Sequence, residues 1–470
     1  MSAFKEFVSD KRITLMGLGL LGRGIGDAEF LAECGALITV TDKKTEEELK
    51  ESVEKLKQYS NITFHLGGHQ IEDFINADLV IKAAGVPLDS PEVAAAKKVG
   101  VPVAMSTALF AKFAREAGAK IVGVTGTRGK STVTQMIYHA LQKAAPRQDS
   151  GRERRVFLGG NVRGVSTLAM LPELSKGSPW TKIVALELDS WQLQGFGDLQ
   201  ISPHIAVFTN LMPDHQNYYP DMDAYFADKA NIFRYQHQGD ALIVGEAVLS
   251  RISMAPTVPS GPFVPPAIPA DWKLRVIGEH NRENASLAAG VLRLLGLSED
   301  EIRTGLESFQ PVEGRLQFVR EVGGVKIYND NNATTPEATL AALKALREVP
   351  NPKLQIPSIT LICGGSEKGL DLKELVQEIK ERVSNVIVLS HPNYKGSERL
   401  ADELQKADVS IEEATSLREA IEKEIKGRNR GKGENGKGGV LLFSPAFASF
   451  GMFKNEYDRN DQFIRLIDEL

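Results

Sequence analysis

The sequence predicts an α/β protein made of three consecutive α/β domains. Short apolar runs rich in valine, isoleucine and leucine alternate with longer amphipathic segments, as expected for parallel strands joined by crossover helices. The alternation starts afresh twice, and two of the three domains open with a glycine-rich turn directly after a strand. At roughly 150 residues per domain, a chain of this length also fits three domains. We place them at residues 1–112, 113–310 and 311–470.

The first domain is predicted from strands at "RITLMGLG", "LITVTD" and "DLVIKAAG" and a helix at "GDAEFLAECG". Gly17, Gly19 and Gly22 form a G-x-G-x-x-G turn between strand and helix, and Asp42 ends the second strand. This pattern is typical of a Rossmann-like domain that binds a dinucleotide. A nicotinamide-dependent oxidoreductase is therefore one hypothesis. The turn also suits other nucleotide diphosphates, because a helix N-terminus recognises their charge.

The second domain opens on "VTGTRGKST", residues 124–132. A strand leads into two glycines, and a lysine and two hydroxyl residues begin a helix expected to end near Gln142. Backbone N–H groups, the helix N-terminus and the lysine favour phosphates, and a hydroxyl suits Mg²⁺. The loop is a shorter form of the P-loop. Its residues are Gly126, Thr127, Gly129, Lys130, Ser131 and Thr132.

Further strands of this domain are expected at "KIVALEL" and "IAVFTN". Glu187 ends the first of them, and Asp214 and His215 follow the second. Ligands of open parallel sheets collect at the carboxyl ends of strands, where a carboxylate can hold a phosphate-bridging Mg²⁺. The residues alone leave open whether Glu187 and His215 bind metal or are solvated. The proline-rich stretch 255–270 is predicted to be a surface loop.

The third domain is predicted to be Rossmann-like, with strands at "VKIYN", "ITLICGG", "NVIVLS" and "GVLLFSP". Helices are expected at "LKELVQEIKERV" and "SLREAIEKEI". Thr335 and Pro336 suit the N-cap and first position of another helix. The glycine-rich and charged stretch 426–439 is predicted to be a flexible exposed loop.

The composition is that of an ordinary globular protein, with 42% apolar and 25% charged residues. A formal net charge of −5 provides no basic stripe for nucleic acid. No run approaches the roughly 20 apolar residues that span a bilayer, and the N-terminus lacks the apolar region of a signal peptide. Cys34 and Cys363 are the only cysteines, which fits a reducing compartment. We therefore expect a cytoplasmic protein that acts on small molecules, away from membranes and nucleic acids.

The chain resembles the Mur ligases over nearly its whole length, and most closely the members that add glutamate to UDP-N-acetylmuramoyl-L-alanine. Nine motifs in the order of that family carry the resemblance. They are "TGTRGKST", "GGNV", "LELDSWQL", "DH" at 214–215, "GEHNRENASLAA", "GRLQ", "YNDNNATTPEATLAAL", "CGGSEKG" and "SPAFASFGMFKN". Membership implies that ATP phosphorylates the alanine carboxylate and that the incoming amine displaces phosphate. It also implies the use of ATP and two Mg²⁺ ions. We expect a monomer, but no motif reports the oligomeric state.

The resemblance assigns a role to each matching residue. Catalysis and the metal ions would involve Lys130, Ser131, Glu187, His215 and Lys229, with Lys229 carbamylated because an ammonium cannot bind a metal. ATP would also contact Gly126, Thr127, Gly129, Thr132, Asn281, Asn284, Arg315 and Asp330. The UDP-linked substrate would contact Gly19, Leu20, Leu21, Asp42, Gly85 and Asn161. The incoming amino acid would contact Thr334, Lys368, Ser449 and Phe450.

Several positions depart from the pattern of the glutamate-adding members. Asn332 replaces a usual lysine, Gly314 a histidine, Asp189 a serine and Glu456 an aromatic residue, and "KAAG" stands where "SPG" is usual. Another acceptor, such as L-glutamate, therefore stays open. A folate-polyglutamating ligase would share the ATP domain but not the N-terminal glycine turn. A non-catalytic nucleotide-binding protein is a further alternative.

Overall fold

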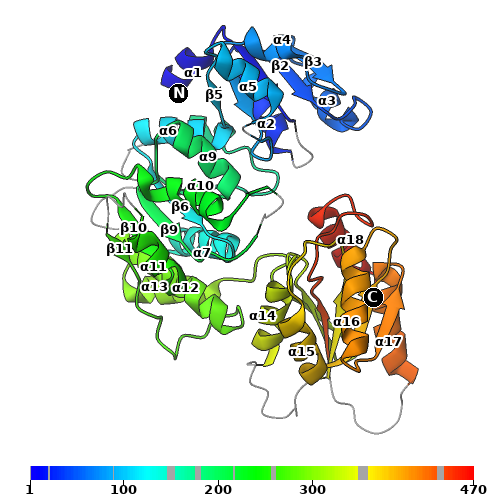
Figure 1. The fold of residues 1–470 in the computed structure, drawn as a ribbon. Helices are drawn as coiled ribbons and strands as arrows, with labels where there is room; N and C mark the ends of the chain where they lie inside the picture. Colours follow the sequence, from blue (N-terminus) through cyan, green and yellow to red (C-terminus); the bar gives the residue numbers. More distant parts are fainter. Residues whose placement is uncertain are drawn as a thin grey trace. The chain divides into compact units, whose positions relative to one another are not determined.

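A computed structural model describes residues 2–18, 22–87, 89–144, 154–174, 182–214, 218–255, 261–347, 358–430 and 439–470. Three sheets, each flanked by helices, follow one another along the chain (Figure 1). Residues 1–270 and 284–306 form one compact unit, and residues 271–283 and 307–470 form a second. The α/β class and the three sheet-bearing parts are as predicted from the alternation in the sequence.

The first sheet has five parallel strands in the order β3-β2-β1-β4-β5. Its strands are β1 (Arg12–Met16), β2 (Leu37–Asp42), β3 (Ile62–Leu66), β4 (Leu79–Lys82) and β5 (Val103–Ala104). Its helices are α1 (Ser2–Val8), α2 (Arg23–Glu33), α3 (Lys50–Leu56), α4 (Ile71–Ile75) and α5 (Pro91–Lys98). The strand order reverses between β1 and β4, so their carboxyl ends flank a ligand crevice of the Rossmann type.

The second sheet has six parallel strands in the order β11-β10-β9-β6-β8-β7. Its strands are β6 (Lys120–Thr125), β7 (Arg155–Gly160), β8 (Lys182–Glu187), β9 (Ile205–Phe208), β10 (Ala241–Val244) and β11 (Pro262–Phe263). The neighbouring helices are α6 (Ser106–Glu116), α7 (Lys130–Lys143), η1 (Leu168–Met170), α8 (Leu171–Leu174), α9 (Ser190–Asp198), α10 (Met222–Arg234), α11 (Glu246–Ser253), α12 (Glu279–Leu294) and α13 (Glu299–Ser308). Strand β6, which leads into the phosphate loop, lies inside the sheet between β8 and β9.

The third sheet also has six strands, in the order β12-β13-β17-β14-β15-β16. Its strands are β12 (Gln317–Val322), β13 (Val325–Asn329), β14 (Ser358–Cys363), β15 (Val383–Leu389), β16 (Ile411–Ala414) and β17 (Gly439–Phe443). Its helices are α14 (Pro336–Arg347), α15 (Lys373–Arg382), α16 (Lys395–Lys406), α17 (Leu417–Arg430) and α18 (Glu456–Asp468). Only β12 is antiparallel, and it joins β13 through Gly323 and Gly324, both at positive φ, as a tight hairpin requires.

Two details of the sequence prediction are wrong. Helix α17 continues to Arg430, so the predicted loop at 426–439 does not begin at residue 426; residues 431–438 lie outside the described part. The predicted loop at 255–270 contains β11, whose Pro262 and Phe263 pair with β10. Proline is tolerated there because β11 is an edge strand.

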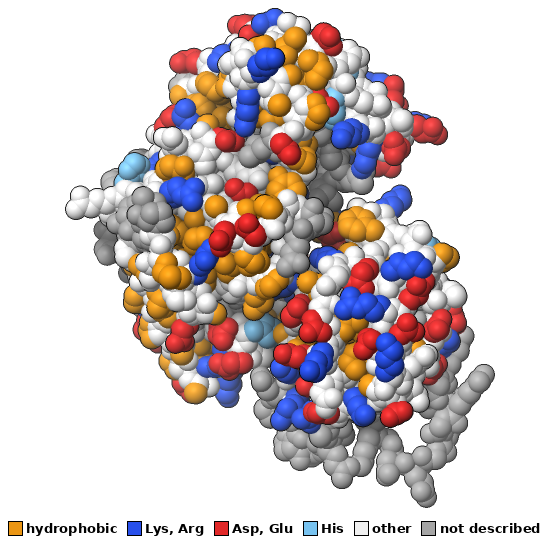
Figure 2. Space-filling view, in the orientation of Figure 1, with side chains coloured by type: hydrophobic (Ala, Val, Ile, Leu, Met, Phe, Trp, Pro, Cys, Tyr) orange, Lys and Arg blue, Asp and Glu red, His pale blue; other side chains and the backbone are white. Residues whose placement is uncertain are grey.

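Buried apolar side chains pack around the sheets as hydrophobic clusters. In Figure 2 lysine and arginine are interspersed with aspartate and glutamate on the visible face of the C-terminal part. This surface shows no field of a single sign. Within the described residues, no helix combines the length and apolar character needed to cross a membrane.

Candidate active site

The phosphate loop follows β6 and depends on two glycines. Gly126 has φ of 141° and Gly129 has φ of 82°, which side chains rarely adopt. A Cβ at Gly126 would lie 1.9 Å from Thr209 Oγ1, and one at Gly129 would lie 2.3 Å from Asn284 Oδ1. The loop is therefore tightly enclosed, and α7 begins directly after it at Lys130. The contact also places Asn284, a predicted ATP residue, against the loop.

The end of β9 holds the loop from the other side. Thr127 N donates to Asn210 O at 3.0 Å, and Arg128 N donates to Asn210 Oδ1 at 2.9 Å. Thr209 Oγ1 donates to Arg128 O at 2.5 Å, and Met212 N donates to Thr127 Oγ1 at 2.9 Å. Such bracing fixes the shape of the loop before any ligand arrives.

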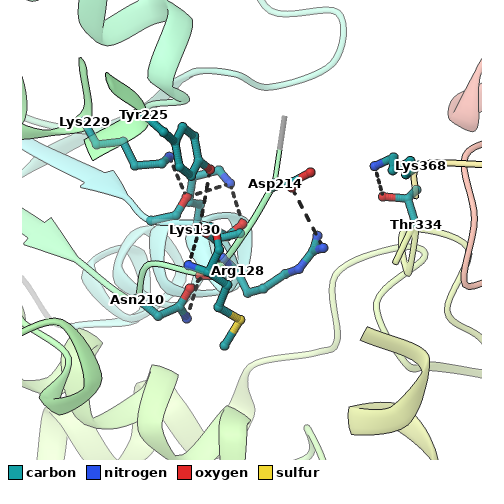
Figure 3. Close-up of polar contacts among 11 residues, drawn as sticks. Arg128, Lys130, Asn210, Asp214, Tyr225, Lys229, Thr334 and Lys368 are labelled. Carbon is teal, nitrogen blue, oxygen red and sulfur yellow. Dashed lines mark hydrogen bonds and ion pairs between the residues drawn. The ribbon is translucent and has the colours of Figure 1, made fainter. Parts of the chain in front are cut away.

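Two lysines converge on one carbonyl of the loop (Figure 3). Lys130 Nζ donates to Gly126 O at 3.2 Å and to Thr127 O at 3.1 Å, and Lys229 Nζ donates to Gly126 O at 2.8 Å. Lys229 is 1% exposed, and its Nζ lies 4.6 Å from the centroid of the Tyr225 ring. Burial, and secondarily the nearby Lys130 charge, lowers the pKa of Lys229 well below its ordinary value. A lowered pKa favours the neutral amine, which is a nucleophile.

A buried carboxylate lies beside the phosphate loop. Glu187 ends β8 opposite Val124 of β6 and is 6% exposed. Asn161 Nδ2 donates to Glu187 Oε1 at 3.4 Å, and Asn161 N donates to the backbone carbonyl oxygen of Glu187 at 2.8 Å. Gly160 allows this approach, because a Cβ there would lie 2.0 Å from Glu187 O. Among the described residues Glu187 has no cationic partner, so its environment fits a divalent cation.

The other predicted metal ligands are only partly described. Ser131 and Thr132 are buried in the first turn of α7. His215 lies outside the described residues. Within the described part of the chain no three His, Cys, Asp or Glu side chains form a metal-binding group. The fit to Mg²⁺ therefore rests on Glu187, the hydroxyls of α7 and the phosphates themselves.

The first domain contributes the ends of β1, β2 and β4. Asp42 Oδ2 accepts from Leu18 N at 2.9 Å and its Oδ1 from Lys44 N at 3.0 Å, so this carboxylate shapes the glycine turn. Gly85 helps to line a cavity of about 210 Å³, together with Gly17 and Lys82. The predicted residues Gly19, Leu20 and Leu21 lie outside the described part.

Lys82 gives the departure at "KAAG" a local explanation. Its side chain is 2% exposed, and its Nζ donates to Val86 O at 2.6 Å and to Ala83 O at 3.4 Å. Burial lowers the pKa of Lys82 to about 8. The hydrogen bonds of the buried lysine therefore stabilise the turn that follows β4. The departure at Asp189 is also local, because Asp189 forms the capping box of α9 with Gln192.

The C-terminal unit holds its predicted residues around the ends of β13, β14 and β17. Asp330 Oδ1 accepts from Leu316 N at 2.9 Å and its Oδ2 from Ser444 Oγ at 2.8 Å. Lys368 Nζ donates to Thr334 Oγ1 at 3.4 Å, so these two predicted amino-acid ligands lie together (Figure 3).

The remaining predicted residues of this unit are placed as follows. Ser449 is 2% exposed and its carbonyl accepts from Tyr394 Oη at 3.1 Å, whereas Phe450 is 61% exposed. Arg315 precedes β12. Asn281 lies in α12 and donates from its amide to Ile277 O at 2.8 Å.

Sequence reasoning missed one residue of this unit, Arg459. It is fully buried in α18, and its Nε and Nη2 donate to Asn331 Oδ1 and O, both at 2.8 Å. Its Nη1 donates to Phe447 O at 3.2 Å. Arg459 thereby ties the loop after β13 to the loop after β17. Arg459 lies four residues before Phe463 and eight before Ile467. This spacing places it on the apolar face of the helix, and it could have indicated from the sequence that the arginine is buried.

Three family models match the chain in order. Residues 11–105 match the N-terminal domain of MurD-like Mur ligases, residues 124–256 the Mur ligase middle domain, and residues 314–446 the glutamate ligase domain of Mur ligases. The chain belongs to the Mur ligase family. The sequence is similar to UDP-N-acetylmuramoylalanine–D-glutamate ligases of Borreliella burgdorferi, at 33% identity, and of Roseiflexus, at 31%. Each comparison covers 98% of this chain and 99% of the relative.

The fold is also similar to that of solved Mur ligases. UDP-N-acetylmuramate-alanine ligase from Thermotoga maritima has a TM-score of 0.60 at 20% identity, with 98% of this chain and 99% of that chain covered. This Mur ligase is therefore an ATP-dependent enzyme of peptidoglycan synthesis that forms carbon–nitrogen bonds. The glycine turn of its first domain serves a ligase, and the oxidoreductase hypothesis is wrong.

Proposed function

We propose that this Mur ligase joins D-glutamate to the alanine carboxylate of UDP-N-acetylmuramoyl-L-alanine. The observation that carries the proposal is the similarity, over nearly the full length, to relatives named for D-glutamate addition. The pair formed by Lys368 and Thr334 supports it, because an ammonium beside a hydroxyl suits a carboxylate of the incoming amino acid. The three domains would divide at residues 112 and 310.

The reaction would proceed in two balanced steps. An oxygen of the alanine carboxylate attacks the γ-phosphorus of ATP, and the bond to ADP breaks. The amino nitrogen of glutamate then attacks the carbonyl carbon, inorganic phosphate leaves with the bonding electron pair, and the nitrogen loses a proton. Both steps gather negative oxygens, so positive groups must be in place beforehand.

The residues of the second domain would supply that charge. Lys130, now folded onto the loop carbonyls, would turn to the outer phosphates of ATP. Glu187 with Ser131 or Thr132 would hold one Mg²⁺, and His215 would hold a second. Magnesium supplies neutralisation of the phosphate oxygens when it is bound.

Lys229 would act as a carbamate. Its burial and lowered pKa favour the neutral amine that reacts with CO₂. The product is a carboxylate, which can bind a cation and places a negative charge near the Lys130 ammonium at Gly126 O.

We also propose that the enzyme is a monomer and acts in the cytoplasm. Both cysteines are buried and unpaired, which fits a reducing compartment. The cytoplasm is also where ATP and nucleotide-linked precursors are available.

An amino-acid panel tests the proposal. Purified protein is given ATP, Mg²⁺, bicarbonate and UDP-N-acetylmuramoyl-L-alanine, together with D-glutamate, L-glutamate or another amino acid. We expect phosphate release and a product of the mass of the D-glutamyl adduct with D-glutamate alone. If the product forms with L-glutamate and not with D-glutamate, the type of reaction stays as proposed but the amino acid that is added is different. Phosphate release that needs no amino acid would refute the ligase.

A further inference from the structure

One face of α2 in the first domain docks closely on the segment that follows β7 in the second. Asp27 Oδ1 accepts from Ser166 Oγ at 2.6 Å, and Arg23 Nη1 donates to Asn161 Oδ1 at 2.9 Å. Between these contacts lies Gly26, where a Cβ would come within 2.7 Å of Ser166 Cβ. Positions 23, 26 and 27 share one face of a helix. The absence of a side chain at Gly26 therefore allows the other two contacts to form.

Asn161 links Arg23 to the carboxylate of Glu187. Arg23 donates to Asn161, and Asn161 donates in turn from Nδ2 to Glu187 Oε1 at 3.4 Å. A guanidinium can only donate hydrogen bonds, so it requires the oxygen of the Asn161 amide on its side. The amide nitrogen then has to face Glu187. The Glu187 carboxylate can only accept and so favours the same orientation, while the arginine holds the amide oxygen from the other side.

The same arginine also borders the glycine turn. Arg23 is the first residue of α2, directly after Gly22, and it lines the cavity at the ends of β1 and β4 with Gly17 and Lys82. Its one hydrogen bond within the described residues uses one of five N–H groups. The others can meet an anion at the turn. One side chain is thus within reach of both the first domain's nucleotide crevice and the second domain's carboxylate.

We propose that Arg23 is a positioning residue that orients the Asn161 amide, and through it Glu187, and so couples the substrate-binding turn to the phosphoryl-transfer site. The coupling rests on the proposed function of Glu187 and of the turn. Arg23 touches neither the reacting atoms nor Glu187 directly. It acts by holding the amide oxygen of Asn161 while the amide nitrogen donates to Glu187.

The first test compares Arg23→Ala and Arg23→Lys with the wild type at varied Mg²⁺, acceptor nucleotide and amino acid. A charge-assisted hydrogen bond corresponds to about a tenfold to hundredfold effect. We expect Arg23→Ala to lower kcat by about tenfold or more and to raise the Mg²⁺ concentration at half-maximal rate similarly. The KM for the amino acid should stay within about twofold, and Arg23→Lys should recover most of the loss. Wild-type values in Arg23→Ala would overturn the proposal.

A matched control separates positioning from simple docking. Ser166→Ala removes the other hydrogen bond of the same helix face without touching Asn161. We expect its kcat and Mg²⁺ requirement to remain within about twofold of the wild type. A loss as large as that of Arg23→Ala would show that only docking matters and would overturn the proposal.

A double-mutant cycle supplies the second test. Once Asn161 is replaced by alanine, Arg23 has no amide to orient, so adding Arg23→Ala should change the rate by less than about threefold. Full additivity of the two losses would contradict the inference.

Failure of the proposed function would look different. If the wild type forms no amide with any amino acid, the function falls. The positioning inference is then decided by calorimetry of ATP binding with and without Mg²⁺. Arg23→Ala should reduce the Mg²⁺-dependent gain in affinity about tenfold or more, and an unchanged gain would overturn the inference.

Discussion

Replacing Arg459 by methionine should destabilise the C-terminal unit by about 3 kcal/mol. The change leaves three buried acceptors, Asn331 Oδ1, Asn331 O and Phe447 O, without their donors. At about 2 kcal/mol for each, the loss is about 6 kcal/mol. Burial lowers the pKa of Arg459 to about 10, so removing the charge returns about 3 kcal/mol. Methionine retains most of the packing of the arginine stem.

Amide hydrogen exchange measures this effect locally, which a multi-domain chain requires. Amides of β14 and β17 in Arg459→Met should exchange about a hundredfold faster than in the wild type. Arg418→Met is the control, because the ion pair of Arg418 with Glu469 is 57% and 46% exposed and surface pairs contribute little. Exchange within about threefold of the wild type in Arg459→Met, or equal acceleration in the control, would refute the reasoning.

Three further changes probe the site and the pH response. Lys130→Ala should reduce phosphate release by about a hundredfold to a thousandfold with an unchanged circular dichroism spectrum, because the loop glycines still form the turn; retained turnover would contradict the P-loop role. Glu456→Gln should lower the KM for D-glutamate if the two carboxylates lie about 6 Å apart, where repulsion is about 2–3 kcal/mol; an unchanged KM would place Glu456 away from the substrate. Burial lowers the pKa of His204 to about 4, so the unfolded chain takes up a proton first as pH falls below about 6.5 and stability declines from there towards pH 4. His204→Asn, which can still accept from Ile121 N, should flatten this decline in thermal unfolding; an unaltered pH profile would show that another group is responsible.

The sequence was most informative where a local rule determines the backbone. A helix expected near residues 131–142 runs over Lys130–Lys143, because a glycine at positive φ ends the turn and fixes where the helix starts. Strand β12 was not predicted, because its apolar residues Phe318, Val319 and Val322 do not alternate with polar ones. Helix α17 was cut short, because glycine and lysine at its end resemble a linker.

Contacts between distant residues could not be predicted in this way. Arg23 and Asn161 are 138 residues apart, and Arg459 and Asn331 are 128 apart. The spacing along α18 places Arg459 on the apolar face, but in neither case does the local sequence show which distant partner the arginine meets. Lys229 shows the same limit, since only the family pattern, and not its own neighbours in sequence, separated it from a surface lysine.

The two edge strands of the third sheet bear on whether the protein aggregates when it is concentrated. Unpaired strand edges recruit further strands from other molecules. Here one edge is the antiparallel β12, which has a bulge between Phe318 and Arg320 and carries Glu321, and the other is the short β16 with Glu412 and Glu413. The bulge on β12 and the acidic side chains on both edges disfavour such pairing, so this sheet should not start cross-β aggregation when the enzyme is concentrated.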